Sequence, residues 1–204
     1  MPLIGCTYRY SGVGKHGEPP LIKEHKYTFR NSLNIQYIVN AEEYEHDMYV
    51  IKFHLKNHTQ CPRKYSIMFC KSKLYKNIMR DKNKNYNYIE ARKILNTCIN
   101  IGHDIHAKNP LASFGFMGMP TIDGKEIENL KETTRYKVYE KLAKFHFKPE
   151  NFEHRRNKEK SLYLLLNKKK ILQNKQVFDE IKNMFLKVYD IDEIYANLLE
   201  TDTD

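Results

Sequence analysis

Apolar and polar residues alternate through much of the first third of the chain, and a period of two indicates β-strands. The clearest segment is Tyr49–Lys56, in which Tyr49, Ile51, Phe53 and Leu55 share one face. Lys26–Arg30 and Ile35–Val39 are rich in aromatic and β-branched residues, and Lys64–Cys70 follows a turn-like segment as a return strand. The pattern therefore predicts a meander of antiparallel strands over residues 26–70.

Three later segments have the three- and four-residue spacing of amphipathic helices. The first runs from about Ile89 to His106 and ends before Asn109-Pro110, because the residue before a proline avoids the helical region. The second covers residues 131–147, and its apolar stripe consists of Tyr136, Tyr139, Leu142, Ala143 and His146. The third covers residues 174–189. We expect each helix to bury one face.

The segments between these helices predict further strands. Leu111–Gly118 has the small and aromatic residues of a buried strand, and residues 120–129 predict a loop. Phe152 and Leu162–Leu166 indicate two more strands, which a basic turn at His154–Lys160 separates. A strand–helix–strand crossover is typical of a mixed sheet covered by helices. We therefore predict a single α+β domain with a mixed, largely antiparallel sheet.

The two ends of the chain differ in composition from this predicted domain, which covers residues 26–189. Residues 1–25 are rich in glycine and proline and predict an irregular N-terminal arm. Residues 190–204 contain six acids and no base. Apolar residues within 191–199 predict a short docked helix, and Glu200–Asp204 are expected to be free. We predict that this acidic segment lies against a basic surface and weakens polyanion binding.

Charge changes the picture more than any other bulk property. The chain has 35 Lys and Arg, 25 Asp and Glu, and a formal net charge of +10. Before residue 190 there are 35 bases against 19 acids, a formal charge of +16. A positive field of this size favours nucleic acid or another acidic partner. A lysine-rich composition without such a role is the alternative interpretation.

The chain lacks the sequence features of a membrane or secreted protein. No window approaches the ~18 uninterrupted apolar residues of a membrane span. The first residues lack the apolar region of a signal peptide. The four cysteines include no CxxC pair, which is typical of reduced thiols. We expect a cytoplasmic protein that does not contact a membrane.

The densest basic stretch runs from Arg63 to Lys93, with ten bases, two acids and interleaved tyrosines. Lysine and arginine can neutralise phosphates, while tyrosine can stack on unpaired bases. The leading hypothesis is an accessory or regulatory protein that binds nucleic acid, and a module that binds an acidic protein is a further alternative. The predicted nucleic-acid-binding residues are Arg63, Lys64, Lys71, Lys73, Lys76, Arg80, Lys82, Lys84, Tyr86 and Tyr88.

Residues 64–167 carry a partial resemblance to a known fold. Their predicted order is a strand, a long helix, a strand, a helix and two closing strands, and Tyr136–Phe147 reads YKVYEKLAKFHF. Both features resemble the C-terminal half of the GNAT N-acyltransferases. The resemblance implies acetyl-CoA as a cofactor and Tyr139 as the general acid. The family's glycine-containing pyrophosphate loop should precede the helix at Ile89, but the chain has no glycine there.

Other catalytic and metal-binding patterns are weak. His54, His58 and Cys61 form one candidate ligand set, and another consists of Cys98, His103 and His106. Each lacks the fourth ligand that structural zinc requires. No Walker A loop, nucleophile–base motif or paired-carboxylate nuclease pattern is present. We therefore expect no metal, and no cofactor except acetyl-CoA under the acyltransferase interpretation.

Overall fold

The computed structural model describes residues 5–16, 20–32, 34–55, 84–118, 120, 122–123, 126–189 and 200–201. Its N-terminal strands are β1 (Tyr8–His16), β2 (Leu21–Arg30), β3 (Gln36–Tyr44) and β4 (Met48–Leu55), with the short 3-10 helix η1 (Glu45–Asp47) before β4. The later strands are β5 (Ser113–Met117), β6 (Ile122–Asp123), β7 (Glu126–Ile127), β8 (Phe152–Asn157), β9 (Leu162–Asn167) and β10 (Glu200–Thr201). The helices are α2 (Lys84–Lys108), α3 (Thr134–His146), α4 (Lys168–Gln173) and α5 (Val177–Tyr189).

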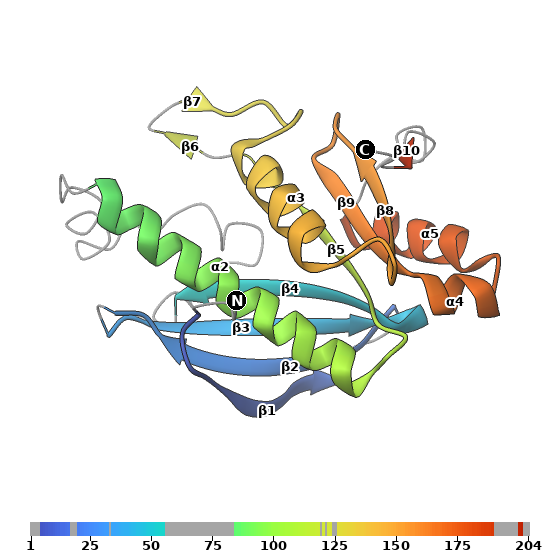
Figure 1. The fold of residues 1–204 in the computed structure, drawn as a ribbon, viewed down its shortest axis with the longest axis horizontal. Helices are drawn as coiled ribbons and strands as arrows, with labels where there is room; N and C mark the ends of the chain where they lie inside the picture. The colour runs from blue at the N-terminus through green and yellow to red at the C-terminus, as the bar shows by residue number, and fades with distance from the viewer. Residues whose placement is uncertain are drawn as a thin grey trace. The chain divides into compact units, whose positions relative to one another are not determined.

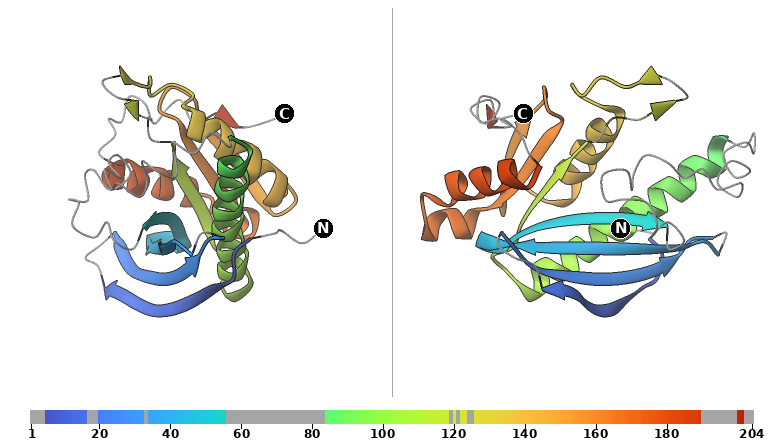
Figure 2. Two further views of the ribbon diagram at one scale, coloured as in Figure 1. Left: turned by 90° about the vertical axis from the view of Figure 1, so that its left-hand side faces the viewer. Right: turned by 180° about the vertical axis from the view of Figure 1, so that it is seen from behind.

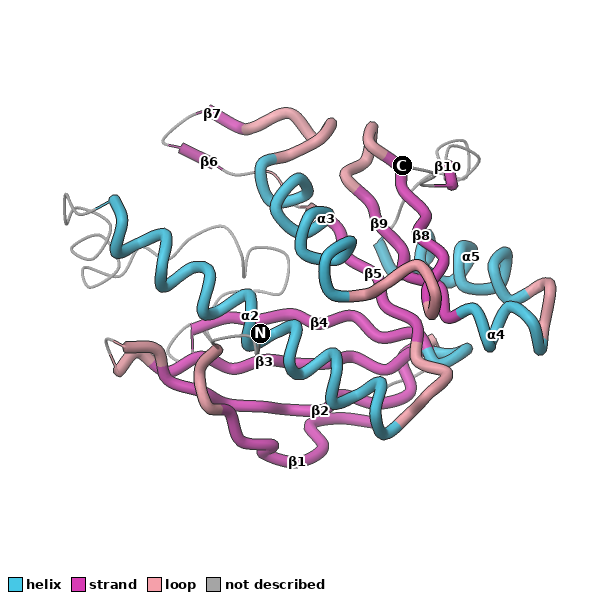
Figure 3. The backbone as a smooth tube through the Cα atoms, in the orientation of Figure 1, coloured by secondary structure: helices cyan, strands magenta, loops and turns pink. Residues whose placement is uncertain are grey.

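One mixed sheet has the strand order β1-β2-β3-β4-β5-β9-β8-β10 (Figure 1). β4 pairs with β5 in parallel, with Met48 opposite Ser113 and Val50 opposite Gly115. β9 is antiparallel to both β5 and β8, and β10 is antiparallel to β8. β6 and β7 form a separate small hairpin (Figure 3). The prediction of an α+β fold with a mixed, largely antiparallel sheet is confirmed.

The chain divides into two compact units, and both contain residues of β1, β2, β3, β4 and α2. Unit 1 comprises residues 1–14, 25–41 and 51–104, and unit 2 comprises residues 15–24, 42–50 and 105–204. In unit 1, α2 lies over one face of the β1–β2 pair (Figures 1 and 2). On this face the Tyr8 hydroxyl of β1 donates to Asp104 Oδ2 of α2 at 2.6 Å. The Cys6 backbone N–H donates to Thr97 Oγ1 at 2.8 Å, which ties the chain before β1 to the same helix.

In unit 2, helices cover both faces of the β5–β9–β8 sheet. Successive side chains of β9 point to opposite faces. Tyr163 packs against Tyr136 of α3, whereas Leu162, Leu164 and Leu166 join the residues of α5. Figures 1 and 2 show α3 and α5 on opposite sides of these strands. All six residues of β9 are buried, as this three-layer arrangement requires.

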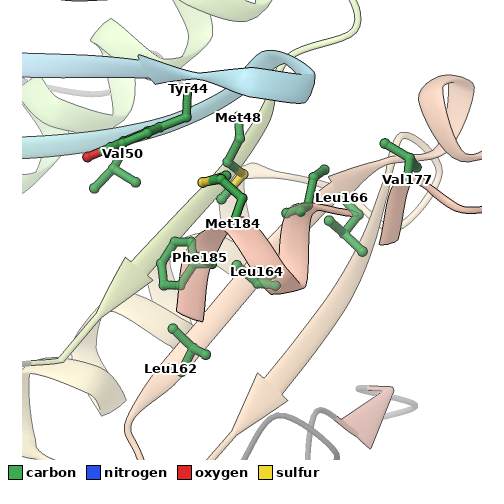
Figure 4. Close-up of a cluster of buried hydrophobic side chains, with 10 residues drawn as sticks. Tyr44, Met48, Val50, Leu162, Leu164, Leu166, Val177, Met184 and Phe185 are labelled. Atoms are coloured by element: carbon green, nitrogen blue, oxygen red, sulfur yellow. The ribbon is translucent and has the colours of Figure 1, made fainter. Parts of the chain in front are cut away.

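The core between the sheet and α5 is a cluster of buried apolar side chains (Figure 4). Its members are Tyr44, Met48, Val50, Leu162, Leu164, Leu166, Val177, Ile181, Met184 and Phe185. Gly115 of β5 faces this cluster, and a Cβ there would come within 2.5 Å of Phe185 Cε2. The glycine therefore lets the Phe185 ring approach the sheet closely.

The structure corrects the predicted N-terminal arm. Residues 8–16 and 21–30 are the strands β1 and β2 instead of irregular chain. β1 lies at the end of the strand order, where glycine is tolerated more readily than in a central strand. Gly12 has φ +109°, a conformation that favours glycine. The glycine content therefore concealed the Tyr8–Tyr10 alternation.

Three other boundaries also differ. Residues 154–157, predicted as part of a turn, belong to β8, whose buried residues include the polar side chains His154 and Asn157. Glu200 and Thr201, predicted to be free, pair with Arg156 and Arg155 of β8. Part of the predicted 120–129 loop forms the β6–β7 hairpin. The predicted strand 64–70 and the predicted helix 191–199 lie outside the described residues.

Candidate nucleic-acid interface

Most of the predicted nucleic-acid-binding residues lie outside the described part of the chain. These are Arg63, Lys64, Lys71, Lys73, Lys76, Arg80 and Lys82. Lys84, Tyr86 and Tyr88 lie in the first turns of α2, so their backbone is helical and not part of a loop. The helix therefore begins at Lys84 and not at the predicted Ile89, because residues 84–88 are polar and have no apolar period that would indicate a helix.

Tyr139 lies on the inner side of α3, as the predicted stripe requires. Tyr136 and Ala143 of this stripe are buried, and Tyr139 is half-buried. The Tyr139 ring meets Phe116 of β5 edge-on, with ring centroids 5.5 Å apart. Phe116 in turn stacks on Tyr163 of β9 at 5.1 Å. The aromatic cluster thus fixes the Tyr139 ring against the sheet.

The opposite side of α3 carries lysines together with exposed apolar side chains. Thr133 caps the helix, since its hydroxyl accepts the Tyr136 backbone N–H at 3.1 Å. Phe145 is 68% exposed and Val138 is 40% exposed. Spacings of three, four and seven residues put the exposed positions on one stripe. We call this stripe the α3 outer face: Lys137, Val138, Lys141, Phe145 and Lys148.

The lysines of the α3 outer face are not neutralised by neighbouring acids. Lys137 and Lys141 are exposed, and no hydrogen bond or ion pair joins the ammonium group of either to another described residue. Lys148 Nζ lies 5.2 Å from the Phe145 ring centroid, a cation–π distance. Glu140, the acid of this helix, is instead shared by Lys144 at 3.8 Å and Arg156 at 3.5 Å. The face is therefore basic as well as partly aromatic.

The α3 outer face was not predicted from the sequence, because the density of bases along the chain is highest elsewhere, between Arg63 and Lys93. The signal was present in the i, i+4 spacing of Lys137, Lys141 and Phe145 on the stripe opposite the apolar residues. A helix whose outer side repeats lysine beside a phenylalanine merits inspection even where the local charge density is ordinary.

The described residues contain no reactive thiol or metal cluster. Burial raises the pKa of the Cys98 thiol to about 12, so it stays protonated at neutral pH. Burial likewise raises the pKa of Cys6. Among these residues, no three His, Cys, Asp or Glu side chains gather closely enough to hold a metal ion. No helix in this part of the chain is long and apolar enough to cross a membrane.

No protein-family model matches the chain, and no curated protein or solved structure matches it either.

Proposed function

We propose that the chain binds nucleic acid, and that the α3 outer face contacts a single strand. The observation that carries the proposal is Phe145, which is 68% exposed on a stripe with two unpartnered lysines. An exposed phenylalanine can stack on an unpaired base, and neighbouring lysines can neutralise the adjacent phosphates. The sequence's excess of 10 positive charges supports the same class of partner.

Single-stranded nucleic acid fits this face better than a duplex. Phe145 projects from a helix whose neighbouring positions carry lysines. Lysine is flexible and lacks the rigid two-pronged donor group with which arginine recognises a base edge. Such side chains recognise phosphate as point charges and give little sequence information. Stacking also tolerates every base, because each base has a π-face. We therefore expect binding with weak sequence preference and strong salt dependence.

The test is fluorescence anisotropy with a labelled thymidine oligonucleotide at several salt concentrations. Phe145→Ala should weaken binding by about 5- to 100-fold, which corresponds to ~1–3 kcal/mol of lost stacking. Lys141→Gln should reduce the slope of log affinity against log salt by about 0.7, the value for one phosphate contact on a single strand. Neither change removes a buried group, so both variants should remain folded.

Matched controls come from the same unit. Leu172→Ala removes an apolar side chain that is 83% exposed on α4, and Lys175→Gln removes an exposed lysine. Both should leave oligonucleotide binding unchanged. Wild-type affinity in Phe145→Ala and Lys141→Gln would overturn the role of the α3 outer face. Salt-insensitive capture of an acidic protein, with no oligonucleotide binding, would favour the protein-interaction alternative instead.

An N-acyltransferase is the second candidate, favoured by the position of Tyr139. Its half-buried ring is held against β5, and α2, β5, α3, β8 and β9 follow one another along the chain. The strand predicted at residues 64–70, with which the GNAT-like order begins, lies outside the described residues. The residues present do not fit acetyl-CoA well, because no glycine precedes α2 to let the backbone approach a pyrophosphate. We therefore derive no catalytic step through acetyl-CoA.

A titration with acetyl-CoA separates the two candidates. Saturable micromolar binding, together with acyl transfer that Tyr139→Phe slows, would favour the enzyme. The Tyr139→Phe change keeps the ring against Phe116 and removes only the hydroxyl, so packing should be preserved. Oligonucleotide binding that falls with salt, without acetyl-CoA binding, would favour the nucleic-acid proposal.

A further inference from the structure

Two arginines on neighbouring strands of unit 1 share one face of the sheet. The hydroxyls of Ser11 on β1 and Thr28 on β2 lie 3.2 Å apart, so these side chains are on the same face. Side chains two residues apart along a strand point the same way, which places Arg9 beside Ser11 and Arg30 beside Thr28. Tyr8 points to the other face, where its hydroxyl contacts Asp104 of α2. The two arginines therefore lie on the face that α2 does not cover.

A shallow hollow of about 460 Å³ lies at this position. Among the described residues that line it, two have cationic side chains and none has a carboxylate. The lining residues are Thr7, Tyr8, Arg9, Thr28, Phe29, Arg30 and Gln36. The neutral polar side chains of Thr28 and Gln36 can add hydrogen bonds to a ligand that the arginines attract. The hollow therefore suits an anion.

Hydrogen bonds orient the Arg30 side chain, whereas the Arg9 guanidinium is available to a ligand. Arg30 Nη1 donates to Asn34 O at 3.1 Å and to Asn34 Oδ1 at 3.0 Å, which leaves Nε and Nη2 for another acceptor. Asn34 has φ 60°, a left-handed conformation that asparagine tolerates. Within the described part of the chain, no hydrogen bond or ion pair engages the Arg9 guanidinium. Like charges on neighbouring strands repel, so an anion between them is stabilising.

We infer that this hollow binds a phosphate monoester. A guanidinium fork takes two oxygens of an anion, so one arginine can satisfy a carboxylate. A terminal phosphate has three oxygens and up to two charges, and it can therefore engage both forks and a hydroxyl together. The phosphate could belong to a free nucleotide or to the 5′ end of a nucleic-acid strand. The inference uses no residue of the α3 outer face and stands apart from the function proposed above.

Calorimetric titration with thymidine monophosphate tests the inference directly. Arg9→Gln and Arg30→Gln should each weaken binding about tenfold or more, because each removes a charge-assisted contact. Lys23→Gln, a loss of one charge elsewhere on β2, should leave affinity unchanged. Thermal unfolding of each variant verifies the fold. Wild-type affinity in both arginine variants would overturn the inference. So would the absence of saturable binding to the wild type below about 10 mM.

A second variant tests the positioning of Arg30 without removing charge. Asn34→Gly keeps the left-handed backbone conformation but removes the Oδ1 acceptor. It should weaken thymidine monophosphate binding about threefold, because Arg30 loses part of its fixed orientation. An unchanged affinity in this variant, together with unchanged affinity in Arg30→Gln, would exclude Arg30 from the site.

Oligonucleotides with a 5′-phosphate or a 5′-hydroxyl distinguish the two sources of the phosphate. Tighter binding of the phosphorylated strand, lost in Arg30→Gln, would assign the hollow to a strand end. Thymidine monophosphate binding without that difference would assign it to a free nucleotide. Both results support the phosphate site. Phe145→Ala should not alter thymidine monophosphate binding, so the hollow and the α3 outer face can fail separately.

Discussion

Lys170 of α4 donates a hydrogen bond to Asp47 and forms an ion pair with it. Asp47 lies in the turn between β3 and β4. Asn109 Nδ2 donates to the other oxygen of the same carboxylate at 2.9 Å. His46 and Asp47 both have left-handed backbone conformations, with φ of 62° and 53°. One carboxylate therefore joins three segments of unit 2 and holds a turn whose backbone is strained.

The first prediction follows from the charge of Asp47. Burial alone would raise the pKa of this carboxyl, but hydrogen bonds from Lys170 and Asn109 outweigh burial and lower the pKa. Asp47→Asn should reduce the free energy of unfolding by about 1 kcal/mol at pH 7, a modest value because the carboxyl is partly exposed. Asparagine also tolerates the left-handed conformation, so the change removes the charge and one of the two acceptor oxygens without adding backbone strain.

The same group predicts a pH dependence. Because the folded pKa lies below the unfolded value, the stabilisation is present above about pH 4 and is lost as the pH falls through the folded pKa. Urea unfolding between pH 7 and about pH 2 should therefore show the difference between the wild type and Asp47→Asn shrinking in acid. Glu45→Gln, at an exposed acid of the same turn, is the control. A constant difference across this range would contradict the assignment.

The second prediction concerns the close approach of Gly118 to the start of α3. A Cβ on Gly118 would lie 2.6 Å from the Tyr136 backbone nitrogen and 2.6 Å from Thr133 Oγ1. Neither group can move without disturbing the helix cap. Gly118→Ala should therefore destabilise the fold by about 1–3 kcal/mol or more in urea unfolding. Gly115→Ala should also destabilise the fold, because a Cβ there would lie 2.5 Å from Cε2 of the buried Phe185 ring as well as 2.4 Å from Met48 Cε.

The third prediction concerns a buried histidine. Phe147 O can only accept, so His154 Nε2, 2.8 Å away, carries the proton, and Nδ1 accepts from the Tyr163 hydroxyl at 2.9 Å. Tyr163→Phe leaves Nδ1 without a donor and should cost about 1–3 kcal/mol of unfolding free energy. A double-mutant cycle with His154→Phe should show coupling of about 1 kcal/mol. Strict additivity would mean that the bond contributes nothing net.

The fourth prediction concerns the C-terminal strand. Deleting residues 200–204 removes the β10 partner of β8, so whichever of the Arg155 and Arg156 amides faces β10 should exchange faster with deuterium. It also removes three acids, which should change oligonucleotide affinity by about 1 kcal/mol or less. Neutralising Glu200, Asp202 and Asp204 in the intact chain separates the effects. That variant should reproduce any change in affinity without the faster exchange.

The regular amphipathic elements could be predicted from the sequence. The stripe of Val177, Phe178, Ile181, Phe185 and Val188 is α5, which spans residues 177–189 within the predicted 174–189. α3 and β4 likewise match within a few residues. In α3 one face is buried and the other is exposed. Burial on one face imposes a period on the sequence, and that period is what pattern analysis detects.

Elements without a contrast between a buried apolar face and an exposed polar face were not predicted correctly. Phe152, His154 and Arg156 lie on one face of β8. Two of these three residues are polar, so the sequence pattern indicated a turn instead of a strand. Those polar groups are stabilised by tertiary partners such as Tyr163 and Glu140, which no local pattern indicates. The hollow between Arg9 and Arg30 depends on two strands being neighbours, and the α3 outer face depends on which lysines lack acids nearby. Both are properties of the folded chain.

The parallel pair of β4 and β5 has a consequence for synthesis on the ribosome. Met48 pairs with Ser113, whereas β8 and β9 meet through a short hairpin in which Asn157 pairs with Leu162. At about 5–20 residues per second, β4 is complete several seconds before β5 exists, while β8 waits less than about two seconds for β9. The apolar side chains of β4 are therefore exposed in the nascent chain for longer than those of β8, and this interval is when chaperones would be needed.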